Sequence, residues 1–167
     1  MSANGIEAGG VTCVGQTLCP GDAKGALLVL SEPLSFWGGT DRRTGLIIDT
    51  HHPEHGASVA GRVLLMDASR GSSSSSSVLA EQIRAGVGPA AILLTARDAI
   101  VSLGTLAAAE LYGTRVPVVL LDTDEAARLR CCDGTTARVS AGVDGRAGVV
   151  LDLTPAAGLP PHAKEPA

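Results

Sequence analysis

Hydroxyl groups are concentrated in one stretch of the chain, residues 69–77, which reads Ser-Arg-Gly followed by six serines. A short apolar block, residues 63–66, comes directly before it and is typical of a buried strand. After it, Leu79, Ile83 and Val87 recur every four residues, which predicts one face of a helix. The serines therefore lie between a strand and a helix N-terminus, where unpaired N–H groups and the helix dipole favour an anion.

The serine tract has two interpretations. A flexible Ser-rich linker is one, and a turn that binds an anionic substrate is the other. A linker joins two domains, whereas this tract has apolar patterning directly on both sides, which favours the binding turn. In that turn we expect contacts to the anion from Arg70, Gly71, Ser73 and Ser74, and Gly71 allows close approach because it has no Cβ.

A second candidate surface contains the only Phe and the only Trp of the chain. These adjacent aromatics precede a pair of glycines, in the order Phe36-Trp37-Gly38-Gly39. Either they fill the core beneath a loop, or they form a shaped surface for a site or a partner. The sequence leaves both interpretations open.

Three of the four histidines fall within residues 51–56. Such a cluster suggests a metal site or a general acid or base. Pro53 and Gly56 predict a loop, however, and a loop fits neither helical nor strand ligand geometry. We therefore expect no metal here, and expect His51 and His52 to contact the substrate or a partner, or to order the loop by hydrogen bonds.

The overall composition excludes several classes of function. The net charge is −4 without a basic block, which argues against nucleic acid or an anionic membrane as partner. The sequence shows neither a membrane-spanning apolar run nor a signal peptide, so we expect a cytoplasmic protein. The four cysteines, Cys13, Cys19, Cys131 and Cys132, do not have zinc or iron–sulfur spacing and are expected to be reduced structural thiols.

Strands and helices alternate through the middle of the chain, which predicts parallel β-α-β units. We expect an α/β domain over residues 25–153, with a mixed sheet or barrel-like core and flanking helices. Residues 1–24 form a partly ordered N-terminal segment in this interpretation, and residues 154–167 a disordered Pro-rich tail. The predicted strands are 11–14, 25–30, 46–49, 63–66, 90–94, 117–121, 136–140 and 147–153, and the predicted helices are 78–87, 98–112 and 123–130.

Several motifs occur together and in a recognisable order. They are Gly25-Ala26-Leu27, Glu32-Pro33-Leu34-Ser35-Phe36-Trp37-Gly38-Gly39, Thr44-Gly45-Leu46-Ile47-Ile48-Asp49, His51-His52-Pro53 and Arg70-Gly71-Ser72-Ser73-Ser74. In these motifs the chain resembles the small subunit of the aconitase X family. The resemblance implies a compact swivelling β/β/α domain of aconitase type. It also implies a hydro-lyase in which this subunit binds no cofactor and a large partner subunit carries an iron–sulfur cluster.

The resemblance also implies a site and a substrate class. The catalytic serine of the family follows the glycine of the Gly-Ser element and corresponds to Ser72. Aconitase has Gly-Ser-Ser-Arg there, and Ser74 stands in place of that arginine, so binding of the substrate carboxylate must fall to another residue or to the partner. Members dehydrate cis-3-hydroxy-L-proline in bacteria or mevalonate 5-phosphate in archaea, and a composition rich in Ala and Gly favours the first.

Two other functions stay open. The same domain could be a non-catalytic scaffold whose serine tract only binds an anion. A phosphohistidine-carrying swivel domain would need a histidine at a mobile tip, and the His51-His52 loop is the only candidate for that role.

Overall fold

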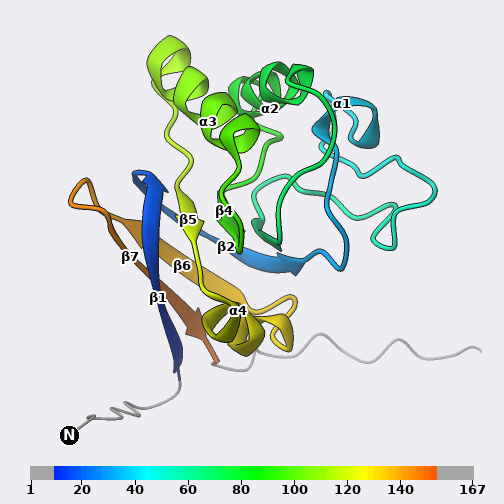
Figure 1. The fold of residues 1–167 in the computed structure, drawn as a ribbon. Helices are drawn as coiled ribbons and strands as arrows, with labels where there is room; N and C mark the ends of the chain where they lie inside the picture. Colours follow the sequence, from blue (N-terminus) through cyan, green and yellow to red (C-terminus); the bar gives the residue numbers. More distant parts are fainter. Residues whose placement is uncertain (1–9, 154–167) are drawn as a thin grey trace, which may run out of the picture.

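The computed structural model describes residues 10–153, in which seven strands and four helices follow one another (Figure 1). The strands are β1 (Gly10–Cys19), β2 (Gly21–Val29), β3 (Val63–Met66), β4 (Ala91–Leu94), β5 (Val118–Leu120), β6 (Thr136–Ala141) and β7 (Arg146–Asp152). The helices are α1 (Phe36–Gly39), α2 (Ser74–Arg84), α3 (Ala99–Tyr112) and α4 (Thr123–Arg130). The tail predicted at 154–167 lies outside the described residues.

The strands close into a barrel in the order β1-β5-β4-β3-β2-β6-β7. Strands β2 to β5 are parallel neighbours, because α2 and α3 return the chain to the same edge between β3, β4 and β5. Strands β1, β6 and β7 pair antiparallel with their neighbours, and β6 and β7 form the predicted hairpin. The predicted α/β domain with parallel units is confirmed.

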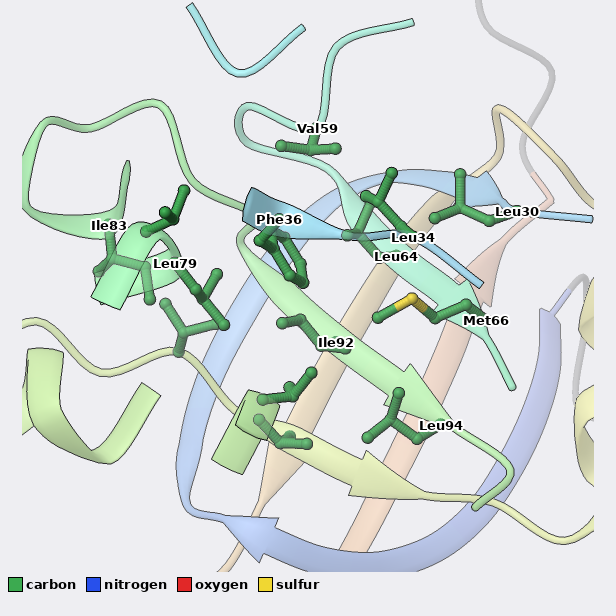
Figure 2. Packing of buried hydrophobic residues seen from close by; sticks show 14 of the residues in the cluster. Leu30, Leu34, Phe36, Val59, Leu64, Met66, Leu79, Ile83, Ile92 and Leu94 are labelled. Atoms are coloured by element: carbon green, nitrogen blue, oxygen red, sulfur yellow. The ribbon is translucent and has the colours of Figure 1, made fainter. Parts of the chain in front are cut away.

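Alternation along the central strands produces two apolar cores, because successive side chains point to opposite faces. On one face Leu64 and Ile92 pack with residues of α2 and α3, as Figure 2 shows around Leu79 and Ile83. On the other face Leu65, among others, packs with residues of α4, β6 and β7. Helices α2 and α3 lie side by side over one part of the barrel, and α4 lies at another, against β1 (Figure 1).

Two predicted strands differ from the structure. Strand β1 covers ten residues, Gly10–Cys19, where the sequence indicated four, and it pairs with both β5 and β7. Residues 46–49 form no strand and make only isolated bridges, Thr40 with Ile47 and Leu46 with Ser58. The apolar pattern of residues 46–49 predicted a strand that does not form. Their bridge partners, Thr40 and Ser58, lie in the same irregular segment between β2 and β3, and only Ile47 of the four is buried. Within residues 10–153, no helix is both long and apolar enough to cross a membrane.

Candidate functional site

The serine-containing turn lies at the carboxyl ends of the parallel strands. This Gly–Ser turn, residues 69–73, follows β3, while residues 30–39 follow β2 and residues 95–98 follow β4. Because β2, β3 and β4 are parallel, the three segments lie at the same edge of the barrel. In α/β folds with parallel strands, both open sheets and barrels, ligands bind at the carboxyl ends of the strands. The turn therefore lies where the topology favours a site.

Asp98 fixes the start of the turn. Its Oδ2 accepts hydrogen bonds from the Ser69 N–H at 2.7 Å and the Ser69 hydroxyl at 2.6 Å. Its Oδ1 accepts from the N–H groups of Ile100 and Val101, so the same carboxylate caps α3. Burial would raise the pKa of Asp98, but the hydrogen bonds from Ser69, Val101 and Ile100 together hold it below its usual value.

Arg70 and Gly71 continue the fixed backbone. The Arg70 N–H donates to the Leu34 carbonyl at 3.1 Å. Gly71 has a φ of 108°, which side chains of L-residues rarely adopt, and a Cβ there would lie 2.9 Å from the Ser35 hydroxyl oxygen. The turn is therefore held against the segment after β2, and only glycine fits at its centre.

The serines of the tract differ in secondary structure and in burial. Ser74 to Ser77 are the first turn of α2, so the helix begins inside the tract and not at Val78 as predicted. Ser75 is buried, and its hydroxyl accepts from the Trp37 N–H at 3.3 Å. The residues at the head of the helix, Ser72, Ser73 and Ser74, are exposed.

The backbone amides at the head of α2 are unpaired. Beyond Arg70, the first N–H groups that donate to carbonyls are those of Ser75 and Ser76, which donate to Ser72 and Ser73 at 3.0 and 3.1 Å. Within residues 10–153, the N–H groups of residues 72–74 donate no hydrogen bond. An exposed hydroxyl on Ser72 thus lies beside unpaired amides at the positive end of an eleven-residue helix.

Arg70, predicted to bind an anion, is already paired. Its Nη2 lies 3.4 Å from Asp49 Oδ2, and the Arg70 side chain is 48% exposed. The backbone N–H of His51 and the Arg70 charge outweigh the effect of desolvation and hold the pKa of Asp49 below its usual value. The guanidinium group that the Gly–Ser turn carries is therefore part of an ion pair and not an isolated cation.

The two adjacent aromatics lie in different environments, one in the core and one at the surface. Phe36 is fully buried in the core beneath the loop, whereas Trp37 is 62% exposed. A cavity of about 400 Å³ opens beside Trp37, and its lining includes Gly38, Arg42 and Val78. Gly39 is buried and does not line it. Val78 is the residue of α2 that lines this cavity, and none of the serines of the tract does.

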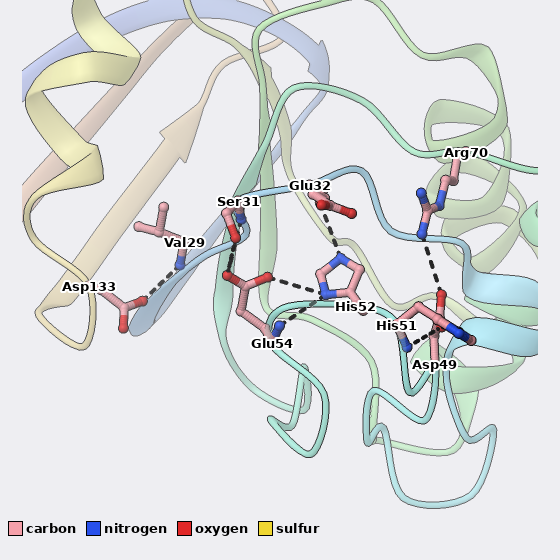
Figure 3. A network of polar contacts seen from close by, with 9 residues as sticks. All are labelled: Val29, Ser31, Glu32, Asp49, His51, His52, Glu54, Arg70 and Asp133. Carbon is pink, nitrogen blue, oxygen red and sulfur yellow. Dashed lines mark hydrogen bonds and ion pairs between the residues drawn. The ribbon is translucent and has the colours of Figure 1, made fainter.

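The histidine loop is ordered by hydrogen bonds (Figure 3). His51 is exposed, whereas His52 is buried and contacts the Glu32 carbonyl and Glu54. Glu54 in turn accepts from Ser31, so the loop is fastened to the segment after β2. In the part of the chain that the structure describes, no three metal-ligating side chains come together.

The cysteines offer no ligand set either. Cys13 and Cys19 are buried in different apolar clusters, and Cys131 and Cys132 are adjacent at the end of α4. All four are free thiols, as predicted. Burial, with a smaller contribution from Glu125, raises the pKa of Cys13 to about 11.

Comparison with known proteins decides the family. A family model described as the aconitase X swivel domain matches residues 12–152. The chain belongs to this family. A solved structure of Thermococcus kodakaraensis aconitase X in its holo form has 27% identical residues and a TM-score of 0.70, over 83% of this chain and 98% of that one.

Curated relatives of this aconitase X swivel domain fall under two different enzyme names. A cis-3-hydroxy-L-proline dehydratase of Pseudomonas aeruginosa is 47% identical over 108 residues, which are 65% of this chain and 19% of the relative. The chain thus spans about a fifth of that protein. A phosphomevalonate dehydratase small subunit of Methanocella arvoryzae is 32% identical over 137 residues, which are 81% of this chain and 95% of the relative.

The residues that support the turn carry little signal in the sequence. Asp98 was recognised as the start of a helix, but nothing in the sequence paired it with Ser69. Ser75 had a signal, since it precedes Leu79 and Ile83 by four and eight residues and so belongs to the buried face of the helix. Asp49 carries no signal, because the apolar pattern of residues 46–49 predicts a strand.

Proposed function

We propose that this chain is the small, swivel subunit of an aconitase X-type hydro-lyase that dehydrates a small hydroxy acid, with Ser72 as its catalytic base. The observation that carries the proposal is the position of Ser72. Ser72 is an exposed residue beside the free amides at the head of α2, on a turn whose backbone is held by Asp98 at Ser69 and by Leu34 at Arg70. The name of the P. aeruginosa relative supports cis-3-hydroxy-L-proline as the substrate.

In the proposed reaction, Ser72 Oγ removes a proton from the carbon next to the substrate carboxylate. The electron pair of that C–H bond forms the new C=C bond while the C–O bond breaks and the oxygen leaves as hydroxide, which becomes water when it takes the proton back from Ser72 and restores the base. The N–H groups of Ser72, Ser73 and Ser74 donate no hydrogen bond within residues 10–153, and they would orient the carboxylate or stabilise the serine alkoxide. They take the place of the arginine that Ser74 replaces.

The isolated chain is not expected to be active. A serine hydroxyl is a very weak acid, and a helix N-terminus stabilises an anion by at most about 2 kcal/mol. One pKa unit corresponds to about 1.4 kcal/mol, so the helix lowers the serine pKa by only about 1.5 units. Exclusion of water and additional cations must supply the remainder, and we propose that the large subunit provides both.

The proposal also assigns the iron–sulfur cluster to the large subunit, where it would serve as Lewis acid. The free cysteines of this chain do not fit a cluster, because two are buried apart in separate cores and the other two are adjacent residues. Within residues 10–153, no other group of three ligands replaces them. The subunit would work in the cytoplasm, without nucleic acid or membrane as partner.

Reconstitution tests this function. The chain is mixed with its large subunit, and dehydration is measured with a panel of hydroxyprolines and mevalonate 5-phosphate. We expect turnover only in the complex, and with cis-3-hydroxy-L-proline. Turnover of mevalonate 5-phosphate would favour the alternative that the archaeal relative's name suggests. Activity of this chain alone would contradict the division of labour, and a complex that turns over none of these substrates would favour a scaffold.

A further inference from the structure

Two thiols come together at the carboxyl end of α4. Cys131 and Cys132 are adjacent in the chain, and their Sγ atoms lie 3.6 Å apart. Both sulfurs also lie close to one carbonyl oxygen, that of Arg128, at 3.5 and 3.6 Å, so they gather on one side of the helix end. Cys131 is exposed and Cys132 is half-buried, and both are free thiols. The fold therefore presents these two sulfurs to the surface as a pair.

The backbone around the pair is held in place by hydrogen bonds. The Cys132 N–H donates to the Leu129 carbonyl at 2.9 Å, and the Cys132 carbonyl accepts from the Thr135 N–H at 3.1 Å. The side chain of Asp133, the next residue, accepts from the Val29 N–H at the end of β2, at 2.8 Å. A ligand that binds both sulfurs thus meets a preformed geometry and has little of the chain to order.

The distance between the sulfurs suits a single centre bound to both. At the length of a zinc–thiolate bond, about 2.3 Å, sulfurs 3.6 Å apart subtend an angle of about 100° at the centre, as in a tetrahedral or pyramidal geometry and unlike a linear one. A direct disulfide suits the pair less well. The Cα atoms of adjacent residues are about 3.8 Å apart, below the range of about 4.4–6.8 Å that ordinary disulfides span.

The number of ligands decides which class of centre the pair can hold. A structural zinc ion or an iron–sulfur cluster takes four protein ligands, and in the described part of the chain no three His, Cys, Asp or Glu side chains come together. A trivalent organoarsenic centre is pyramidal and needs only two thiols, because its third bond is to its own organic group. We propose that Cys131 and Cys132 form a dithiol site that chelates trivalent organoarsenic compounds. This site does not depend on the proposed function.

The binding step is a condensation in which nothing is oxidised or reduced. An arsenic(III) oxide, R–As=O, reacts with the two thiols: two S–H bonds break, two S–As bonds form, and the oxide oxygen leaves with both protons as water. Arsenic stays trivalent throughout. The exposed thiol of Cys131 reacts first, and the bond to Cys132 then closes within the same molecule. Because the second thiol is present at a high effective concentration, the chelate is more stable than either single bond.

Mass spectrometry of the intact, folded chain tests the site, with phenylarsine oxide as the probe. We expect one adduct, with the mass of the reagent less one water, and proteolysis should place it in the peptide that contains Cys131 and Cys132. The adduct should survive an excess of glutathione, a monothiol, and be removed by ethanedithiol, a dithiol. Absence of an adduct, its removal by glutathione, or its location on Cys13 or Cys19 would overturn the proposal.

Variants of the pair separate chelation from the reactivity of a single thiol. In Cys131→Ser and in Cys132→Ser one thiol remains, so the glutathione concentration that removes half of the reagent should fall at least about 100-fold. Cys19→Ala is the control, since it removes a buried thiol from another cluster and should leave the adduct unchanged. Cys131 is exposed, so Cys131→Ser should keep the fold, as circular dichroism would verify, and it decides the question if Cys132→Ser unfolds. A folded single-thiol variant that holds the reagent as firmly as the unmodified chain would contradict chelation.

Discussion

Ser69 donates both its backbone N–H and its hydroxyl to a single carboxylate oxygen of Asp98, at 2.7 and 2.6 Å. Asp98 is only 8% exposed and uses its other oxygen to cap α3. One buried carboxylate therefore connects the loop after β3, which carries Ser72, to the helix after β4. The stability of the site and that of α3 should consequently change together.

Replacement of Asp98 tests this connection. Asp98→Ala removes a helix cap, which contributes about 1 kcal/mol, and charge-assisted hydrogen bonds to Ser69, which contribute about 1.5–3 kcal/mol. We expect the free energy of unfolding, measured in urea, to fall by roughly 2–4 kcal/mol. Asp124→Ala, at an exposed position in the first turn of α4, is the control and should cost less than about 1 kcal/mol. Equal losses would show that the Ser69 contact contributes nothing.

The same carboxylate predicts a dependence of stability on acid. The pKa of Asp98 is lower in the folded chain than in the unfolded chain, so the folded state binds the proton less tightly. The stabilisation is therefore complete above the unfolded value, near about 3.9, and is lost as the pH falls through the folded value. Urea unfolding at pH 7 to 3 should show the stability difference between the unmodified chain and Asp98→Asn shrinking below about pH 4. A difference that stayed constant over this range would contradict the assignment.

Gly71 should not tolerate a side chain. Its φ of 108° strains any L-residue, and a Cβ would lie 2.9 Å from Ser35 Oγ. We expect Gly71→Ala to destabilise the fold more than Gly113→Ala, because Gly113 also has positive φ, at 70°, but faces open space. Ser35→Ala should relieve part of the cost, so the double variant should lose less stability than the sum of the two single variants. Strict additivity would indicate that Ser35 does not confine this position.

The thiols should differ widely in reactivity. Cys131 is exposed, whereas Cys13 and Cys19 are 0% and 2% exposed, and burial raises the pKa of Cys13 to about 11. Because the thiolate is the reactive form, iodoacetamide at pH 8 should modify Cys131 first and leave Cys13 and Cys19 intact until the chain unfolds. Peptide mass spectrometry over time measures the order. Early labelling of Cys13 would contradict its burial.

Elements whose formation depends only on the local sequence pattern were predicted correctly. The apolar run at Val63–Met66 is strand β3, Asp98 and Gly113 delimit α3, and Val143-Asp144-Gly145 is the turn of the β6–β7 hairpin. Contacts between distant segments could not be predicted in this way. Barrel closure through β1, the pairing of Asp98 with Ser69, and the burial of His52 all join residues far apart in sequence.

The serine tract shows the limit most clearly. Sequence patterning placed the start of the tract correctly, after a strand and before a helix, because both flanking periodicities are local. It could not divide six identical residues into one buried hydroxyl, that of Ser75, and the exposed ones at the head of α2. That division depends on the helix register and on the Trp37 N–H, which comes from another loop.

The kcat of the reconstituted complex with Ser72→Ala tests the central claim most directly, with Ser77→Ala as the matched control. Both serines are exposed members of the same tract, but Ser77 lies within α2, one turn beyond the free amides. We predict that Ser72→Ala lowers kcat by at least about 10³-fold while association with the large subunit is unchanged, and that Ser77→Ala retains full activity. A Ser72→Ala complex that assembles and keeps its kcat would contradict the account and leave the chain a scaffold.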